Sequence, residues 1–249
     1  MRAVLDEGVA GPVALVTGGT GGIGTACVRR LAADGFTAVA AWRSTPPADG
    51  AAPAVRFDVT DAAAVDAAVA EVEARWGELD VVVANAGFAH LDLAVRVSPE
   101  RFRAVVDADM TGAFLVARAA LRSMVRRRRG RIVFVGSVAG YWGVPGVTSY
   151  AAAKSGLLGL ARSLAREVGS RGITVNVVAP GLLDNAADRI DGERSNRGVA
   201  AGWVEATPLR RAGTPEEVAA GVAFLASARA GFITGAVLPV DGGFAMGVG

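Results

Sequence analysis

The stretch Val13-Ala14-Leu15-Val16-Thr17-Gly18-Gly19-Thr20-Gly21-Gly22-Ile23-Gly24 joins a short apolar run to a string of glycines. The run Val13–Thr17 has the length of a buried strand, and Ile23–Ala33 has the pattern of an amphipathic helix. Glycines at a strand-to-helix turn let backbone N–H groups approach a pyrophosphate at the helix N-terminus, where the helix dipole favours an anion. The stretch therefore predicts a dinucleotide-binding turn.

Two spacings of the dinucleotide-binding motif fit this turn, and the turn alone does not decide between them. Gly19, Gly21 and Gly24 have the spacing G-x-G-x-x-G, whereas Gly18, Gly22 and Gly24 have the spacing G-x-x-x-G-x-G. The alternative is a flexible strand-to-helix turn that binds no ligand.

Short apolar runs continue to alternate with longer amphipathic segments along the chain, which predicts an α/β fold of parallel strands joined by helices. No linker interrupts this pattern, so we expect one domain over residues 1–249. The expected strands are Val13–Thr17, Thr37–Trp42, Ala54–Phe57, Val81–Ala84, Arg131–Gly136, Ile173–Ala179 and Val237–Val240. The expected helices are Ile23–Ala33, Ala62–Arg75, Pro99–Val125, Tyr150–Val168 and Pro215–Ala226.

The end of the second strand bears on which dinucleotide is bound. An NAD site usually places an acidic residue there to hold the ribose 2′-hydroxyl. This chain has Arg43 and Ser44 instead, which suit a 2′-phosphate, so NADP is favoured over NAD. The alternative for Arg43 is an ordinary solvated loop arginine. Asp58 and Val59 follow the third strand, where Asp58 either contacts the adenine or caps the next turn.

Lys154 is the only lysine in 249 residues, and it lies four residues after Tyr150 in the segment Tyr150-Ala151-Ala152-Ala153-Lys154. On a helix, this spacing places the ammonium on the same face as the phenol. A nearby cation favours the phenolate and lowers a tyrosine pKa from its ordinary value of about 10. The pair therefore indicates a tuned proton donor, which arginine in place of Lys154 would not reproduce.

Composition narrows the classes of partner. With 52% hydrophobic and 20% charged residues and a formal net charge of +2, the chain gives no reason to expect nucleic acid or a membrane as a partner. A single cysteine, Cys27, excludes an intramolecular disulfide and a cysteine-rich metal site, and we expect no metal. No signal peptide or long apolar span is visible, which favours a soluble cytoplasmic protein.

Several linked motifs resemble the short-chain dehydrogenase/reductase family over nearly the full length, from Val13 to Gly243. The motifs are Thr17-Gly18-x-x-x-Gly22-x-Gly24, Asn85-Ala86-Gly87, Ser137 thirteen residues before Tyr150, Tyr150-x-x-x-Lys154, and Pro180-Gly181. Segments 136–140, 165–167, 172–181 and 239–243 look like bacterial 3-oxoacyl-acyl-carrier-protein reductases, and the glycine turn also resembles that of acetoacetyl-CoA reductases. The resemblance implies a doubly wound Rossmann-type domain, with a seven-stranded parallel sheet in the order 3-2-1-4-5-6-7 and helices on both faces.

The resemblance also implies roles for individual residues. Tyr150 would protonate the substrate carbonyl oxygen, Ser137 would hydrogen-bond it, and Lys154 would lower the tyrosine pKa and bind the nicotinamide ribose. The implied cofactor-binding residues are Thr17, Gly18, Thr20, Gly22, Ile23, Gly24, Arg43, Ser44, Asp58, Val59, Asn85, Ala86, Gly87, Tyr150, Lys154, Pro180, Gly181 and Asn185.

Two positions depart from the family pattern. Asp109 stands where the family usually has an asparagine that helps to hold a water in a proton relay, largely through its backbone carbonyl. An aspartate would preserve that carbonyl while adding a negative charge near Lys154, which would oppose the lowering of the tyrosine pKa. Asn185 stands where a threonine commonly binds the nicotinamide carboxamide, and its amide can still donate and accept.

Substrate identity is expected to depend on residues 182–207, a glycine-containing segment that we interpret as a lid over cofactor and substrate. Trp142, Val144 and Trp203 either build an apolar acyl or aromatic pocket or serve in packing or subunit contacts. His90 is interpreted as a surface loop residue rather than a catalyst.

The run Arg126-Arg127-Arg128-Arg129-Gly130-Arg131 ends the long helix. Such runs are usually solvated faces that complement the helix dipole. In acyl-carrier-dependent relatives, however, basic residues matching Arg128 and Arg171 meet the acidic carrier protein. The family also suggests a homotetramer built on the long helices.

The sequence thus predicts an NADPH-dependent reductase of 3-oxoacyl thioesters, linked to a carrier protein or to coenzyme A. One alternative is a ketoreductase of a polyketide or other specialised pathway, with the same catalytic residues and a different lid. Another is an NADP-binding protein of structural or regulatory role whose catalysis Asp109 has weakened.

Overall fold

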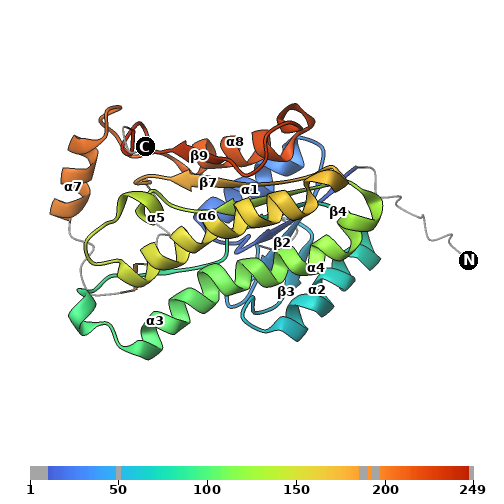
Figure 1. The fold of residues 1–249 in the computed structure, drawn as a ribbon, viewed down its shortest axis with the longest axis horizontal. Helices are drawn as coiled ribbons and strands as arrows, with labels where there is room; N and C mark the ends of the chain where they lie inside the picture. Colours follow the sequence, from blue (N-terminus) through green and yellow to red (C-terminus); the bar gives the residue numbers. More distant parts are fainter. Residues whose placement is uncertain (1–10, 49–51, 185–189, 192–196, 247–249) are drawn as a thin grey trace, which may run out of the picture.

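The computed structural model describes residues 11–48, 52–184, 190–191 and 197–246. Its centre is a seven-stranded parallel sheet in the order β3-β2-β1-β4-β6-β7-β9, which confirms the predicted order because β5 and β8 lie outside this sheet (Figure 1). The strands are β1 (Val13–Thr17), β2 (Thr37–Trp42), β3 (Ala54–Arg56), β4 (Leu79–Ala84), β6 (Gly130–Val135), β7 (Ile173–Pro180) and β9 (Val237–Val240). The chain order reverses between β1 and β4, which is where doubly wound sheets bind their ligands.

Helices cover both faces of the sheet, as predicted (Figure 1). One apolar core lies under α1 (Gly22–Ala33) and α8 (Pro215–Ala226), which pack side by side. The other core lies under α2 (Ala62–Trp76), α4 (Gly112–Arg127) and α6 (Thr148–Val168). Strands buried on both faces must be apolar throughout, and β1, β4 and β6 consist almost entirely of buried Val, Ile, Leu, Ala and Phe.

Smaller elements lie at the carboxyl ends of the strands: β5 (Ala89–His90), α3 (Pro99–Val106), α5 (Ala139–Trp142), β8 (Ile190–Asp191) and α7 (Arg197–Ala206). Single 3₁₀ turns occur at Ala94–Arg96, at Gly169–Arg171 before β7, and at Ala228–Ala230 after α8. β5 and β8 form a separate two-stranded parallel sheet. No helix in the described ranges is long and apolar enough to span a membrane.

The structure differs from the prediction of one long helix at Pro99–Val125, and the difference lies in the middle of that segment. It consists of α3, a π-helical turn at Asp107–Thr111, and α4, with helical backbone angles at both junctions. A π turn inserts a residue without breaking the helix, so the apolar periodicity that predicted one helix does not reveal it. Such turns occur frequently at functional sites, and this one contains the buried Asp109.

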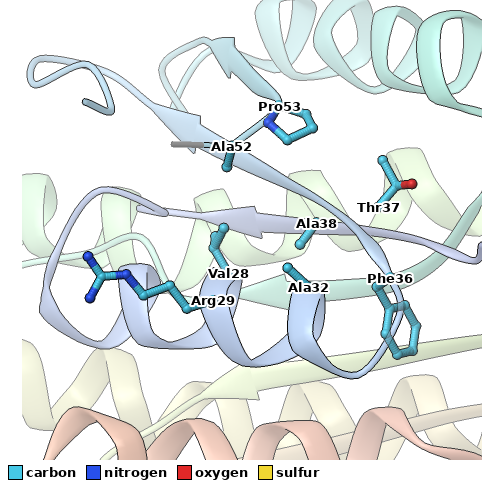
Figure 2. A pocket seen from close by; sticks show the side chains of 8 residues that line it. All are labelled: Val28, Arg29, Ala32, Phe36, Thr37, Ala38, Ala52 and Pro53. Atoms are coloured by element: carbon cyan, nitrogen blue, oxygen red, sulfur yellow. The ribbon is translucent and has the colours of Figure 1, made fainter. Parts of the chain in front are cut away.

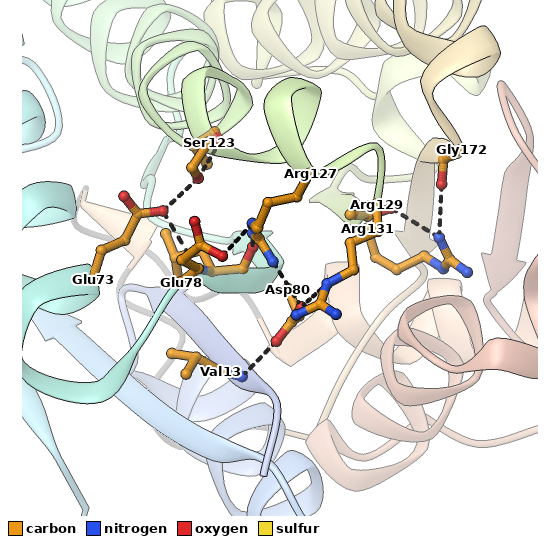
Figure 3. A network of polar contacts seen from close by, with 12 residues as sticks. Val13, Glu73, Glu78, Asp80, Ser123, Arg127, Arg129, Arg131 and Gly172 are labelled. Carbon is orange, nitrogen blue, oxygen red and sulfur yellow. Dashed lines mark hydrogen bonds and ion pairs between the residues drawn. The ribbon is translucent and has the colours of Figure 1, made fainter. Parts of the chain in front are cut away.

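The arginine run at the end of α4 is only partly a solvated face. The Arg127 side chain is just 11% exposed, pairs with Glu78 and Asp80 at 3.1 Å each, and also donates to the carbonyl of Leu79. Asp80 pairs in addition with Arg129 at 3.1 Å and accepts the Val13 N–H at 3.1 Å (Figure 3). The prediction of a solvated face is therefore wrong for Arg127, because its guanidinium closes the amino-terminal ends of β1 and β4.

Replacing Asp80 with alanine is expected to lower the free energy of unfolding by about 2–4 kcal/mol, because Arg127 and the Val13 N–H lose a largely buried acceptor. The control is Glu71→Ala, which breaks an exposed i,i+4 pair with Arg75 and should cost about 0.5 kcal/mol or less. Urea unfolding followed by circular dichroism measures both variants. Equal losses would contradict a structural role for this network.

Candidate active site

The glycine turn between β1 and α1 is held in one shape by close backbone contacts. Gly18 has a left-handed conformation (φ 61°), and its carbonyl accepts the Gly21 N–H at 3.0 Å. A Cβ on Gly24 would lie 1.9 Å from the Gly18 carbonyl oxygen, and one on Gly19 would lie 2.8 Å from Ala40 Cα. Residues from both candidate spacings are therefore sterically required, so the geometry does not single out either motif.

The N-terminus of α1 suits an anion. Its N-cap is Gly21, and in the described part of the chain no side chain caps it. The first N–H groups of the helix are thus left for another acceptor, as a pyrophosphate site requires. Thr20, Gly22 and Ile23 are each half-buried beside this turn, and Ile23 also packs against the core under α1. The cradle fits the diphosphate of a dinucleotide.

The end of β4 is tied to the end of β1 through Thr17. The buried Thr17 hydroxyl accepts the N–H groups of Asn85 (2.9 Å) and Ala86 (3.0 Å), and the Asn85 amide donates to the Thr17 carbonyl at 3.0 Å. Thr17 therefore positions Asn85 and Ala86 beside the glycine turn. The predicted cofactor residues from these two strand ends lie next to one another.

Lys154 is 4% exposed and is held between two elements. Its Nζ donates to the carbonyl of Val135, the last residue of β6, at 3.0 Å, and lies 3.0 Å from Asp109 Oδ1. Asp109 is itself buried, and its Oδ2 accepts the Phe88 N–H at 2.9 Å. The prediction that Asp109 adds a negative charge beside Lys154 is confirmed.

Burial alone would lower the pKa of Lys154, because it disfavours the charged form. The Asp109 carboxylate and Tyr150 act in the opposite direction, and the net pKa of Lys154 is raised. A raised pKa keeps the ammonium charged at neutral pH, and the stability from this charge is lost only as pH rises through the raised value. Lys154 is therefore a cation at neutral pH.

Tyr150 lies beside this cation, Ser137 lies two residues after the Val135 carbonyl that the ammonium contacts, and both side chains are half-buried. The Lys154 ammonium is 5.3 Å from the centre of the Tyr150 ring. Ser137 follows β6 directly, and its Oγ accepts the Ala139 N–H at 3.2 Å. The next turn packs on α6, because a Cβ on Gly140 would lie 2.8 Å from the Lys154 carbonyl carbon. The structure thus brings the predicted serine, tyrosine and lysine together where β6 ends.

Arg43 and Asp58 lie at the ends of β2 and β3. Arg43 is 62% exposed, and its Nη1 is 3.3 Å from Asp58 Oδ2. Burial would raise the pKa of Asp58, but hydrogen bonds from Thr60 and the Arg43 guanidinium lower it below its ordinary value. Asp58 caps its turn by accepting the Thr60 N–H (2.9 Å) and hydroxyl (2.8 Å). The capping alternative for Asp58 is therefore observed, and its predicted adenine contact stays a prediction.

The remaining predicted cofactor residues lie at separate strand ends. Ser44 is exposed next to Arg43, and Val59 packs against the start of α4. Pro180 and Gly181 form the turn after β7, with the Gly181 N–H donating to the Val240 carbonyl at 3.0 Å. A Cβ on Gly87 would lie 2.3 Å from Asp109 Oδ1, so this glycine lets the end of β4 approach the carboxylate. Asn185 lies outside the described residues.

One candidate was missed by sequence reasoning. Phe244 stacks on Trp203 at 5.0 Å and meets Trp142 at 5.8 Å. A single Phe in a C-terminal segment carries no motif, so no sequence signal identified Phe244. His90, predicted to be in a surface loop, is half-buried in β5.

One apolar hollow lies away from this location, and no metal site is formed by the residues that the structure describes. Within the described ranges, no group of three His, Cys, Asp or Glu residues could hold a metal. A hollow of about 450 Å³ lies between α1 and the start of β2, lined by residues that include Val28, Phe36 and Pro53 (Figure 2). It opens at the amino-terminal end of β2, whereas the catalytic candidates follow the carboxyl ends of strands.

Comparisons with known proteins agree with this geometry. Residues 18–245 match a family model described as Enoyl-(Acyl carrier protein) reductase. The chain is 47% identical to the 3-oxoacyl-[acyl-carrier-protein] reductase MabA of Mycobacterium avium over 94% of this chain and 89% of that protein. Identity to the MabA of Mycobacterium tuberculosis strain H37Rv is 45%, over 99% and 100% of the two chains. Identity to the 3-oxoacyl-[acyl-carrier-protein] reductase FabG of Escherichia coli K12 is 39%, over 95% and 98%.

The resemblance implied this sheet order, this glycine turn and this grouping of Ser137, Tyr150 and Lys154. The matches to known proteins span nearly the whole chain. The chain therefore belongs to the short-chain dehydrogenase/reductase family and is an enzyme of the 3-oxoacyl-acyl-carrier-protein reductase type.

Proposed function

We propose that the protein reduces a 3-oxoacyl thioester to the 3-hydroxyacyl thioester with NADPH. The observation that carries this proposal is the buried Lys154 ammonium, fixed 5.3 Å from the Tyr150 ring beside the Ser137 loop. The similarity to proteins named 3-oxoacyl-[acyl-carrier-protein] reductases supports the substrate class. When bound, the cofactor supplies the hydride that adds to the carbonyl carbon.

The roles of the residues follow from their chemistry. The Tyr150 hydroxyl gives its proton to the carbonyl oxygen as that oxygen gains negative charge, and the Ser137 hydroxyl donates a hydrogen bond to the same oxygen. The Lys154 cation favours the resulting phenolate. Of its three N–H donors, one is directed to Val135 and one faces Asp109, which leaves a third for a ribose hydroxyl.

We propose NADPH rather than NADH because of the charge at the end of β2. Arg43 is exposed, and the only acid near its guanidinium in the described contacts is Asp58, which belongs to the following strand end. The Arg56 Nε donates to the Arg43 carbonyl at 3.1 Å, and the Arg56 guanidinium lies over the Trp42 ring at 5.3 Å. A second cation therefore stands beside the turn, which supports recognition of a 2′-phosphate.

We also propose that the substrate is delivered by an acyl carrier protein. Arg171 is exposed, and Arg128 reaches the Ser170 carbonyl at 2.6 Å, so the two cations lie close together on one surface. Carrier proteins are acidic, and charge complementarity would guide their docking. If Arg171→Glu leaves the preference for carrier-linked over CoA-linked substrate unchanged, that result contradicts docking at this surface.

We also propose a homotetramer built on the long helices.

Purified protein is expected to oxidise NADPH in the presence of acetoacetyl-CoA, and Tyr150→Phe is expected to lower kcat by roughly 10²–10⁴-fold, because the proton donor is lost. The control is Tyr141→Phe, the only other tyrosine, which should remain close to wild type. Absorbance at the reduced-nicotinamide band follows both reactions. Tight NADPH binding with no turnover would favour a different ketone substrate or a non-catalytic role.

Arg43→Ala is expected to lower the preference for NADPH over NADH by about 10–100-fold, which corresponds to one charge-assisted hydrogen bond of about 1.5–3 kcal/mol. The effect should appear in KM for NADPH, with little change for NADH. Arg75→Ala removes an arginine that is also exposed but lies at the end of α2, and it serves as the control. An unchanged preference in Arg43→Ala would show that the 2′-phosphate is recognised elsewhere.

Asp109→Asn is expected to move the acidic limb of the pH–rate profile for 3-hydroxyacyl-CoA oxidation to lower pH. In that direction Tyr150 must lose its proton before it can accept one from the substrate. Removing the carboxylate 3.0 Å from Lys154 lets the cation lower the tyrosine pKa without an opposing negative charge. Asp107→Asn changes an exposed residue two positions earlier and should leave the profile unchanged. If the Asp109→Asn profile coincides with wild type, Asp109 does not tune the proton donor.

A further inference from the structure

Arg56 on β3 and Trp42 on β2 form a stacked pair at the edge of the sheet. β3 is the edge strand next to β2 (Figure 1), and in their parallel register Trp42 is the partner of Arg56. The Arg56 guanidinium lies over the Trp42 ring, 5.3 Å from its centre. Trp42 is half-buried, whereas Arg56 is exposed. Cation–π attraction holds a guanidinium on an aromatic face, so the ring limits the positions that the Arg56 side chain can take.

Most of the donors of the Arg56 guanidinium are free. An arginine side chain has five N–H donors in a planar fork. The Arg56 Nε donates to the Arg43 carbonyl at 3.1 Å, which joins β3 to the residue after β2. The two Nη groups form no hydrogen bond or ion pair with any residue that the structure describes. The stack therefore fixes a cation whose Nη donors are available to an acceptor.

The stacked pair lies on the face of the sheet that α1 covers. Side chains alternate between the two faces along a strand. On β2, Ala38 and Ala40 belong to the core under α1, so Trp42 lies on the same face. On β3, Ala54 packs against that core, and Arg56 follows it by two residues. Both side chains are therefore on the side of the sheet where the helix after the glycine turn packs.

The glycine turn itself lies directly against β2. The Gly19 N–H donates to the Ala41 carbonyl at 2.8 Å, and a Cβ on Gly19 would lie 2.8 Å from Ala40 Cα. Trp42 is the next residue of β2, so the stacked pair lies at the strand end that the turn contacts. In dinucleotide-binding folds, the adenosine ribose binds between the glycine turn and the end of the second strand.

The charges at this position leave room for a cation besides Arg43. The segment Thr17–Gly24 has no charged residue. Arg43 is paired with Asp58 at 3.3 Å, so these two opposite charges largely cancel. A phosphate monoester carries about −1.5 to −2 charges at pH 7. Arg56 adds a positive charge that no carboxylate of the described residues contacts, and this charge attracts such an anion.

Building on the proposed use of NADPH, we propose that Arg56 is a specificity-determining residue for the cofactor. Its Nη groups bind the 2′-phosphate together with Arg43, and Trp42 holds the guanidinium in position. Dinucleotide motifs place the residues that recognise this ribose in the glycine turn and at the end of the second strand. Arg56 lies on the third strand, so no motif identifies it.

Arg56→Gln is expected to lower the preference for NADPH over NADH in kcat/KM by about tenfold or more, because a charge-assisted contact is lost. The loss should appear in KM for NADPH, with kcat and the KM for NADH close to wild type. The matched control is Arg75→Gln, which removes an arginine that stacks on Trp76 at 4.2 Å but belongs to α2. An Arg56→Gln preference equal to that of the wild type overturns the proposal.

Calorimetric titration with adenosine 2′,5′-bisphosphate and adenosine 5′-monophosphate gives a readout that needs no turnover. Arg56→Gln should weaken bisphosphate binding by about tenfold and leave monophosphate binding unchanged. If this difference is found but the wild type reduces no 3-oxoacyl thioester, the proposed reaction is rejected and the assignment of Arg56 stands. If the wild type binds both nucleotides equally, the assignment is rejected together with the preference for NADPH.

A double variant separates a direct phosphate contact from mere support of Arg43. In Arg43→Ala, the side chain that Arg56 would support is gone, although the backbone carbonyl that accepts its Nε remains. Adding Arg56→Gln to Arg43→Ala should still weaken bisphosphate binding by about tenfold. If the double variant binds the bisphosphate as Arg43→Ala does, Arg56 acts only through Arg43 and the proposed contact is wrong.

Discussion

The buried pair of Lys154 and Asp109 is the constraint on which the rest of the site depends. An isolated ammonium at 4% exposure would be strongly disfavoured, so this lysine needs an acceptor of opposite charge and further hydrogen bonds. Asp109 provides the charge at 3.0 Å and the Val135 carbonyl provides the second acceptor. Asp109 is in turn held by the Phe88 N–H, and Gly87 leaves the space for its carboxylate. Four segments therefore have to meet at one point for the lysine to be buried there: α6, the π turn, the end of β6 and the turn after β4.

The parallel sheet makes this meeting possible because it brings the carboxyl ends of its strands to one edge. The ends of β1 and β4 are joined through the Thr17 hydroxyl, and the end of β6 is joined to α6 through Lys154. At the opposite edge, Arg127 and Asp80 join β1, β4 and α4 with no catalytic candidate nearby. One edge of the sheet is thus closed by structural ion pairs, and the other presents a glycine cradle, a buried cation and a half-buried phenol.

Much of the fold could be predicted from the sequence because strands that are buried on both faces appear as uninterrupted apolar runs. The observed bounds of β1, β2 and β9 are the predicted ones. The proximity of Tyr150 and Lys154 could be predicted because a lone lysine four residues after a tyrosine is a local pattern. The π turn, the burial of Arg127 and the capping role of Asp58 depend on which elements become neighbours, and no local pattern encodes them. Phe244 was missed for the same reason, since its importance arises only when α7 and the C-terminal turn meet.

The protonation of the Lys154 side chain tests the role of the buried pair most directly. It can be measured without overlap from other residues, because the chain has a single lysine. Labelling with ¹⁵N-lysine gives one side-chain signal, which can be followed by NMR as the pH is raised. We expect the ammonium to stay protonated above the ordinary lysine pKa of about 10.4, and Asp109→Asn to move its titration to lower pH. A wild-type signal that titrates below that value, or one that Asp109→Asn leaves unchanged, would contradict the central role of the buried pair.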